Sequence, residues 1–188
     1  KVAMNEVDAE DAAAILFTSG STGVPKGVCY THANFSAQLG ALKKLYGIQP
    51  GEIDLATFPL FALFAPALGM TSIIPDMDFT RPGEVNAESI IHAIEKYEAT
   101  TMFGSPALLN RVGRWGVERG KRLPRLKRVI SAGAPVSAAV IQRFSSLLEK
   151  DIEIFTPYGA TEALPVASIG GKEVMQQTGR LTGEGRGV

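Results

Sequence analysis

The stretch that decides the fold is Phe17-Thr-Ser-Gly-Ser-Thr-Gly-Val-Pro-Lys-Gly27, a glycine-rich turn between two short apolar runs. Residues 13–17 and 27–31, on either side, have the composition of buried strands. Gly20 and Gly23 allow backbone N–H groups to turn inward as a nest for anions, and Lys26 adds a compact positive charge. The turn predicts a polyphosphate site, and the alternative is a surface turn rich in serine and glycine.

Two other phosphate-binding motifs do not fit this turn. A Walker A loop needs a second glycine five positions after the first, and Gly20 is followed at that spacing by Pro25. The dinucleotide motif Gly-x-Gly-x-x-Gly is absent as well. The hydroxyl groups that would add donors to the turn are those of Thr18, Ser19, Ser21 and Thr22.

Further along the chain, short apolar runs alternate with patterns of helical spacing, which predicts an α/β fold with a mainly parallel sheet. Asn34 is expected to cap a helix that ends at Gly47. Further helices are expected over 86–97, after Pro106 and after Ser137. The expected strands cover residues 72–75, 100–103, 126–131 and 153–156.

Polar turns follow three of these strands: residues 18–23, 132–135 and 158–162. In parallel sheets, ligands bind beyond the carboxyl ends of the strands, so we expect the three turns to line one crevice. In the last turn, an aromatic ring could stack on a base and Glu162 could supply a hard oxygen ligand for Mg²⁺. A plain strand-end turn and a helix start are the structural alternatives for the last two segments.

The turn over 17–27 resembles the signature of the adenylate-forming superfamily, aromatic-Thr-Ser-Gly-Ser/Thr-Thr-Gly-x-Pro-Lys-Gly, at every fixed position. Two further family motifs follow in order, as Ser131-Ala-Gly-Ala-Pro135 and Tyr158-Gly-Ala-Thr-Glu162. The resemblance implies the large N-terminal domain of an enzyme that activates a carboxylic acid with ATP and Mg²⁺, with CoA as a further cofactor where a thioester is made.

The resemblance also implies roles for individual residues. Lys26, Thr161 and Glu162 would be catalytic, and Glu162 would hold the metal. The nucleotide would be bound by Thr18, Ser19, Gly20, Ser21, Thr22, Gly23, Lys26, Gly133, Ala134, Pro135, Tyr158, Gly159, Ala160 and Thr161.

One position departs from the family. Members often have Pro-Leu-Phe-His where this chain has Pro59-Leu-Phe-Ala62, so the histidine that gates the acyl site is missing. The sequence here looks most like the β-lactone synthetases of bacterial olefin biosynthesis, in which the hydroxyl of a β-hydroxy acid displaces AMP. The residues expected to line the acyl pocket, or else to be plain core, are Phe61, Ala62, Phe64, Phe103 and Gly104.

The amino-acid composition limits the classes of partner and the location that can be expected for this protein. The 188 residues include 19 Lys and Arg against 19 Asp and Glu, which argues against a nucleic-acid partner. Cys29 is the one cysteine, and residues 1–8 contain no apolar run typical of a signal peptide. No run is long enough for a transmembrane helix, and a cytoplasmic location is expected. A homo-oligomer or partner enzymes of the same pathway stay open.

The family comparison suggests that residues 1–188 are a fragment, because the start of the large domain and the small C-terminal domain have no match. Such a fragment is expected to be inactive alone. Three functions remain open: activation of a fatty or β-hydroxy fatty acid, activation of an amino acid, and non-catalytic nucleotide binding. Phe103-Gly-Ser-Pro106 carries no acidic residue to hold a substrate amine, which disfavours the second.

Overall fold

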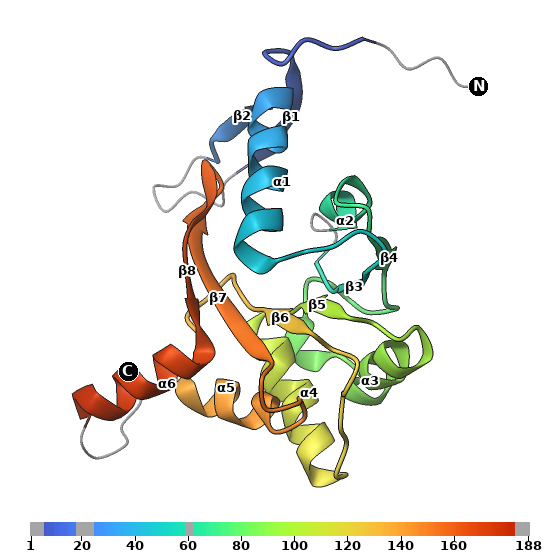
Figure 1. Cartoon of the computed structure of the whole chain (residues 1–188), viewed down its shortest axis with the longest axis vertical. Coiled ribbons are helices and arrows are strands. Elements are labelled where there is room, and N and C mark those ends of the chain that lie inside the picture. The colour runs from blue at the N-terminus through green and yellow to red at the C-terminus, as the bar shows by residue number, and fades with distance from the viewer. Residues whose placement is uncertain (1–5, 18–24, 59–61, 183–188) are drawn as a thin grey trace.

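The computed structural model of the chain describes residues 6–17, 25–58 and 62–182. Within these ranges the strands form two sheets (Figure 1). The smaller sheet is an antiparallel pair, β1 (Ala12–Phe17) and β2 (Gly27–Thr31). The larger sheet has six strands in the order β4-β3-β5-β6-β7-β8.

The larger sheet is parallel except at one edge, where β8 runs antiparallel to β7. This confirms the predicted α/β fold with a mainly parallel sheet. Its strands are β3 (Ile53–Ala56), β4 (Thr71–Ile73), β5 (Thr101–Phe103), β6 (Arg128–Ile130), β7 (Glu153–Ala160) and β8 (Ala163–Gly170).

Helices cover both faces of the larger sheet, with α3, α4 and α5 on one side and α1 on the other (Figure 1). The helical segments are α1 (His32–Tyr46), α2 (Phe64–Ala67), the 3₁₀ turn η2 (Pro82–Glu84), α3 (Ala87–Lys96), α4 (Pro106–Glu118), α5 (Ala138–Ser145) and α6 (Gly171–Thr182). Across the described ranges, no helix is both long and apolar enough to span a bilayer.

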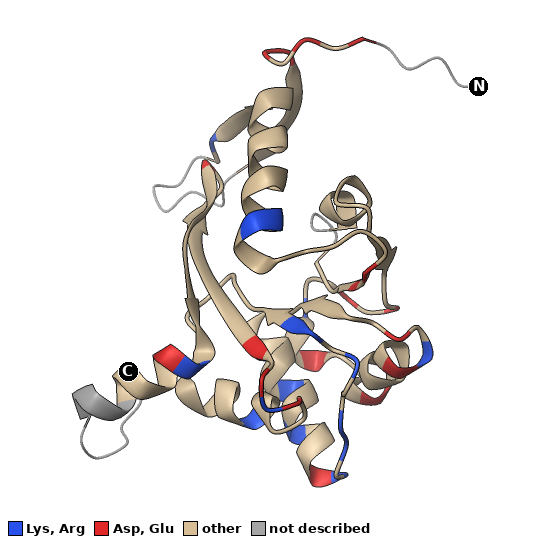
Figure 2. Ribbon diagram, in the orientation of Figure 1, with Lys and Arg blue, Asp and Glu red and all other residues tan. Residues whose placement is uncertain are grey.

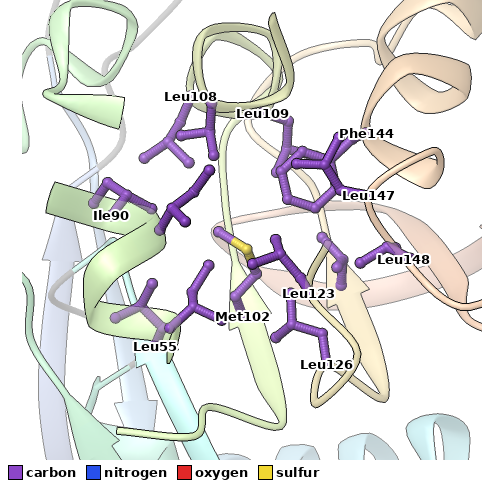
Figure 3. Packing of buried hydrophobic residues seen from close by; sticks show 14 of the residues in the cluster. Leu55, Ile90, Met102, Leu108, Leu109, Leu123, Leu126, Phe144, Leu147 and Leu148 are labelled. Carbon is purple, nitrogen blue, oxygen red and sulfur yellow. The ribbon is translucent and has the colours of Figure 1, made fainter. Parts of the chain in front are cut away.

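The main core lies between the sheet and helices α3 to α5 (Figure 3). Because side chains alternate along a strand, one residue of each central strand points into this core. These residues are Leu55, Met102, Val129 and Ile154, which are fully or almost fully buried and lie in register across β3, β5, β6 and β7. The opposite face is therefore left for a second set of side chains, which forms the candidate site.

The start of α1 differs from the prediction. Thr31, not Asn34, is the N-cap: its hydroxyl accepts from the Asn34 N–H at 3.3 Å, and its own N–H donates to Asn34 Oδ1 at 2.9 Å. Asn34 thus occupies the third helical position of a capping box, in which both residues are good caps by composition. The predicted end is confirmed, since Gly47 has the left-handed φ of 62°.

The last predicted strand is longer than expected. The prediction ended it at Thr156, yet β7 continues through Pro157, Tyr158 and Gly159 to Ala160. Pairing with β8 extends it, because the antiparallel partner satisfies the backbone groups of a segment that its composition marks as a turn. Pro165 lies in β8 at the sheet edge, where a missing N–H is tolerated.

Candidate functional site

The glycine-rich turn lies largely outside the described residues, so Thr18, Ser19, Gly20, Ser21, Thr22 and Gly23 stay predictions. The strands on either side of it are present as the β1–β2 pair, which confirms the predicted strand–turn–strand frame. The predicted burial of β1 is wrong, since Ile15 and Phe17 are 61% and 72% exposed. Lys26, just before β2, is exposed. A basic side chain is thus accessible beside the turn.

The third predicted turn is the tip of a hairpin. Thr161 and Glu162 form the turn between β7 and β8, and the Glu162 side chain is exposed. Tyr158 precedes it on β7 with 74% of its surface exposed, which is unusual for a large aromatic ring and leaves a face for stacking. The expectation that 158–162 is all turn is wrong, because three of the five residues belong to the strand.

The hairpin tip is tied to β2 and α1. The Tyr30 phenol donates a hydrogen bond to the Thr161 carbonyl. Gln38 on α1 donates from Nε2 to the Leu164 carbonyl at 3.1 Å and to the Tyr30 hydroxyl at 3.3 Å. Figure 1 shows the tip of β7–β8 beside β2. Two motifs more than 130 residues apart in sequence are thereby held side by side.

A groove of about 300 Å³ runs along this junction. Its walls come from β2, α1 and the hairpin, and Glu162 is on its rim. Figure 2 shows few charged residues along α1 and the hairpin, whereas residues of both signs are mixed around α3 to α5. The Glu162 carboxylate is therefore a prominent charge in this part of the molecule.

The sequence predicts that Gly159 binds the nucleotide. In the structure, Gly159 has a packing role. A Cβ built there would lie 2.6 Å from Leu164 Cδ1 and 2.7 Å from the Ala163 carbonyl oxygen. The hairpin can close this tightly because position 159 has no side chain. Ala160, its neighbour, pairs with Ala163 next to the turn.

The second predicted turn follows β6. Gly133 has a φ of 96°, a conformation that favours glycine, and the space around its Cα is open. Ala134 and Pro135 are exposed, and Ser137 caps α5 as predicted, accepting from the Val140 N–H. The segment thus presents open backbone to any ligand that lies along it.

A narrow cavity of about 80 Å³ lies between the sheet and α1, inside a hollow of about 740 Å³ that includes open solvent. It reaches the second motif through Ala132, and it ends next to the third, since Pro157, the residue before Tyr158, lines it. Its wall is mainly apolar and comes from α1, the α2 segment, the sheet and the hairpin. The remaining lining residues are Gln38, Leu42, Tyr46, Ile48, Asp54, Phe64, Ala65, Leu68, Met70, Thr101, Phe103, Ile130, Leu164 and Pro165.

Only some of the residues predicted to line the acyl pocket line the cavity. Phe64 and Phe103 line the cavity. Ala62 is half-buried and Gly104 is buried against Leu108 and Leu109, and neither lines it. Phe61 lies outside the described residues.

Sequence reasoning missed the polar residues of the cavity, Gln38 and Asp54. Gln38 lies one helical turn before Leu42 on α1, and a polar residue at helical spacing from an apolar one was the available signal. Asp54 interrupts the short apolar strand β3, and a charged residue within such a strand was a second signal.

Beside the cavity, Arg128 and Glu52 form a buried ion pair on the sheet. Arg128 donates from Nη2 to Glu52 Oε1 at 3.0 Å and from Nη1 to the Thr101 hydroxyl at 2.7 Å. Burial pushes the pKa of Glu52 upward, but the hydrogen bonds and charge of Arg128 outweigh it and hold that pKa below its usual value. Asp54, nearby, has its pKa raised to about 7 by burial, against the attraction of Arg128.

A metal ion at this site would be coordinated mainly by the phosphates of a bound nucleotide. In the described ranges, no three His, Cys, Asp or Glu side chains gather into a metal cage. Mg²⁺ in nucleotide sites often takes one or two carboxylates and completes its shell with phosphates and water. An exposed carboxylate at the hairpin tip, Glu162, fits that donor set.

Comparison with known proteins gives a consistent result. A family model described as "AMP-binding enzyme" matches residues 1–185. An olefin beta-lactone synthetase of Stenotrophomonas maltophilia (strain K279a) is 51% identical over 181 residues, covering 96% of this chain and 32% of the relative. A long-chain-fatty-acid–CoA ligase of Salmonella typhimurium is 28% identical, covering 94% and 32%. The chain thus spans about a third of the length of these relatives.

Solved structures agree on the fold. The inhibitor-bound N-terminal domain of FACL13 from Mycobacterium tuberculosis matches with a TM-score of 0.78 at 24% identity, over 94% of this chain and 44% of that one. O-succinylbenzoate coenzyme A synthetase from Bacillus subtilis, in complex with AMP, matches with a TM-score of 0.71 at 22% identity, over 90% and 34%.

Proposed function

Because this chain belongs to the AMP-binding enzyme family, we propose that it is part of an enzyme that activates a fatty or β-hydroxy fatty acid with ATP. The observation that carries the proposal is the apolar cavity that opens beside the segments after β6 and before the hairpin tip. An apolar chain would fill the cavity, and its carboxylate would lie toward the nucleotide segments. The sequence similarity to olefin beta-lactone synthetases supports the same substrate class.

In the proposed reaction, a carboxylate oxygen of the acid attacks the α-phosphorus of ATP, and the bond to pyrophosphate breaks. The products are acyl-adenylate and pyrophosphate. Positioning and neutralisation of charge supply most of the rate in transfers of this kind. Mg²⁺, when bound, would neutralise charge on the phosphate oxygens.

The chain's residues are assigned as follows. Lys26 and the turn over 18–23 hold the departing pyrophosphate, and Thr161 binds the α-phosphate. The exposed ring of Tyr158 and the open backbone of residues 133–135 bind the adenine, with Gly159 and Ala160 beside it. Glu162 holds the metal, and the position of its exposed side chain on the groove supports this assignment.

The second step forms either a CoA thioester or a β-lactone. Ala62 stands where the family often has its gating histidine. An internal hydroxyl nucleophile needs no gate for a second substrate, so Ala62 favours the β-lactone route. Association with enzymes that supply the acid, or with a second copy of the protein, and a cytoplasmic location belong to this proposal.

We further propose that residues 1–188 form part of the large N-terminal domain of a longer enzyme. The coverage of about a third of the relatives' length supports this. Activity is therefore to be measured on the full-length protein that contains this chain.

Amino-acid activation is the second candidate function, and the observation that favours it is Asp54, a buried carboxyl on the cavity wall. ATP–pyrophosphate exchange separates the candidates. Decanoic and β-hydroxydecanoic acids are expected to support exchange, whereas leucine and phenylalanine are not. Exchange with the amino acids alone would select the second candidate, and no exchange with any acid would leave only non-catalytic nucleotide binding. The Lys26→Ala variant is expected to raise KM for ATP more than KM for the acid.

A further inference from the structure

Asp54 lies on the face of the sheet that borders the cavity. It is on β3, in register with Ser72 on β4 and with Thr101 on β5. Registered residues point to the same side of a sheet, so these three side chains share one face. Leu55, the next residue, points to the opposite face and into the main core.

The surroundings of Asp54 within the cavity are apolar. Leu42 and Tyr46 face the sheet from α1, Phe64 comes from α2, and Phe103 is two residues beyond Thr101 on β5. Only 7% of Asp54 is exposed. An ionisable side chain buried to this degree normally has a hydrogen-bonding partner.

No group in the described part of the chain hydrogen-bonds to the Asp54 carboxyl. The nearby cation is already engaged, because Arg128 donates to Glu52 and Thr101. Arg128 attracts Asp54 through space, but burial dominates and raises the pKa of Asp54 to about 7. A carboxyl in this state is ready to exchange a hydrogen bond with a neutral polar group.

Gln38 presents a second unsatisfied group on the same cavity. Its Nε2 donates to Leu164 and Tyr30, whereas its Oε1 is buried without a partner among the described residues. Gln38 Oε1 and the Asp54 carboxyl thus give the apolar cavity two groups that can accept a hydrogen bond from a ligand. The Ser72 hydroxyl, on the same face of the sheet as Asp54, is also buried without a partner among the described residues.

We propose that Asp54 is a specificity-determining residue whose carboxyl receives the hydrogen bond of a hydroxyl group carried by the acyl substrate. The proposal rests on the function proposed above and assigns a residue to the recognition of a hydroxy acid. A plain fatty acid would leave the carboxyl without a partner, so it binds less tightly.

A hydroxyl suits the site better than an ammonium group. An ammonium in contact with Asp54 would be repelled by Arg128, whose charge already acts at Asp54. It would also have to leave water for a wall made mostly of leucine, phenylalanine and methionine side chains. A neutral hydroxyl is not repelled by Arg128, and it costs less to remove from water than a charged ammonium does.

The test is calorimetric binding of β-hydroxydecanoic acid, decanoic acid and β-aminodecanoic acid to the full-length protein without ATP. The wild type is expected to bind the hydroxy acid roughly tenfold more tightly than decanoic acid, since the site hydrogen-bonds a substrate hydroxyl. Asp54→Val removes the acceptor and is expected to bring this ratio to about one. Asp54→Asn keeps one acceptor oxygen in nearly the same shape and is expected to give an intermediate ratio.

Asp76→Asn is the matched control, because it makes the same change at an exposed aspartate that does not line the cavity. It should keep the wild-type ratio. The proposal is overturned by an equal ratio in wild type and both Asp54 variants, by tighter binding of the amino acid, or by binding of none of the three acids. If Asp54→Val does not fold, the Asp54→Asn ratio decides. Binding without ATP also separates this test from the exchange assay: a protein that binds as expected but supports no exchange contradicts the proposed function alone.

Discussion

The Tyr30 phenol on β2 donates a hydrogen bond to the main-chain carbonyl of Thr161, the first residue of the β7–β8 turn. This contact joins the strand that leaves the glycine-rich turn to the motif expected to bind the α-phosphate. A hydrogen bond thus connects the two proposed halves of the nucleotide site directly. Its removal should change their relative position without removing any proposed ligand.

Tyr30→Phe removes the hydrogen bond to Thr161 and the one received from Gln38. It is therefore expected to raise KM for ATP roughly threefold to tenfold, which corresponds to about 1 kcal/mol. The measurement is ATP–pyrophosphate exchange at varied ATP. Tyr97→Phe is the matched control, because Tyr97 is a half-exposed tyrosine at the end of α3. An unchanged KM for ATP in Tyr30→Phe would show that the link does not position the site.

The buried pair of Arg128 and Glu52 gives a second prediction. Both side chains are less than a tenth exposed. Arg128→Met would leave the Glu52 carboxylate buried without its partner, which is expected to cost about 3–5 kcal/mol in the free energy of unfolding. Urea denaturation measures this cost.

Arg122→Met is the comparison for that experiment. Arg122 pairs with Glu149 at 3.0 Å, but both side chains are more than half exposed. Loss of such a pair is expected to cost about 1 kcal/mol or less. Similar losses in the two variants would contradict the assignment of Arg128 and Glu52 as a buried structural pair.

Asp54 predicts how stability depends on pH. Its pKa rises from 3.8 in the unfolded chain to about 7 in the folded protein, so the folded state holds the proton more tightly. The free energy of unfolding should therefore fall as pH rises from about 4 to about 7, by an amount on the order of 4 kcal/mol. Asp54→Asn cannot ionise and should remove this slope.

The charged and titratable groups around Asp54 act in other pH ranges. Glu52 has a pKa lowered by its hydrogen bonds to Arg128, so the stability that this pair provides is lost only at more acidic pH. Tyr46 faces the cavity with a pKa raised by burial, and it ionises at alkaline pH. Urea titrations between pH 4 and pH 8 that give the same slope for wild type and Asp54→Asn would exclude Asp54 as its source.

Two glycines give opposite predictions. Gly159→Ala would place a methyl group within 2.7 Å of the Ala163 carbonyl oxygen, and the backbone of the hairpin would have to shift. We expect a loss of about 1–3 kcal/mol in the free energy of unfolding. Gly40→Ala on α1 meets no atom within 4 Å, and alanine in a helix should instead add about 0.5–1 kcal/mol. Thermal unfolding that ranks the two variants in the reverse order would be inconsistent with the hairpin packing.

The sequence predicts the parts of the fold that local chemistry controls. The Gly47 stop and the Ser137 cap follow from residue preferences at helix ends, and the structure confirms them. The helix expected over 86–97 is also present as α3, where Asn86 is the N-cap. The predicted start of α1 at Asn34 was wrong, because Thr31 and Asn34 are both good N-caps and only the geometry selects Thr31.

The strand that the sequence did not predict, β8, forms because it pairs with another strand. β8 contains Pro165 and has no alternating pattern, so its strand structure depends on pairing with β7. For the site, the glycine-rich turn and the hairpin motif could be read as local patterns. Asp54 and Gln38 could not be placed on one cavity, since their approach depends on how α1 packs across the sheet.

The most direct test of the central claim is the fate of ATP during a single turnover of the full-length protein with β-hydroxydecanoic acid. Rapid quenching followed by mass spectrometry would follow the nucleotide products. Attack at the α-phosphorus predicts acyl-adenylate and pyrophosphate in equal amounts, with AMP released afterwards. Formation of ADP and inorganic phosphate, with no acyl-adenylate, would place the attack at the γ-phosphorus and contradict the proposed activation of the acid.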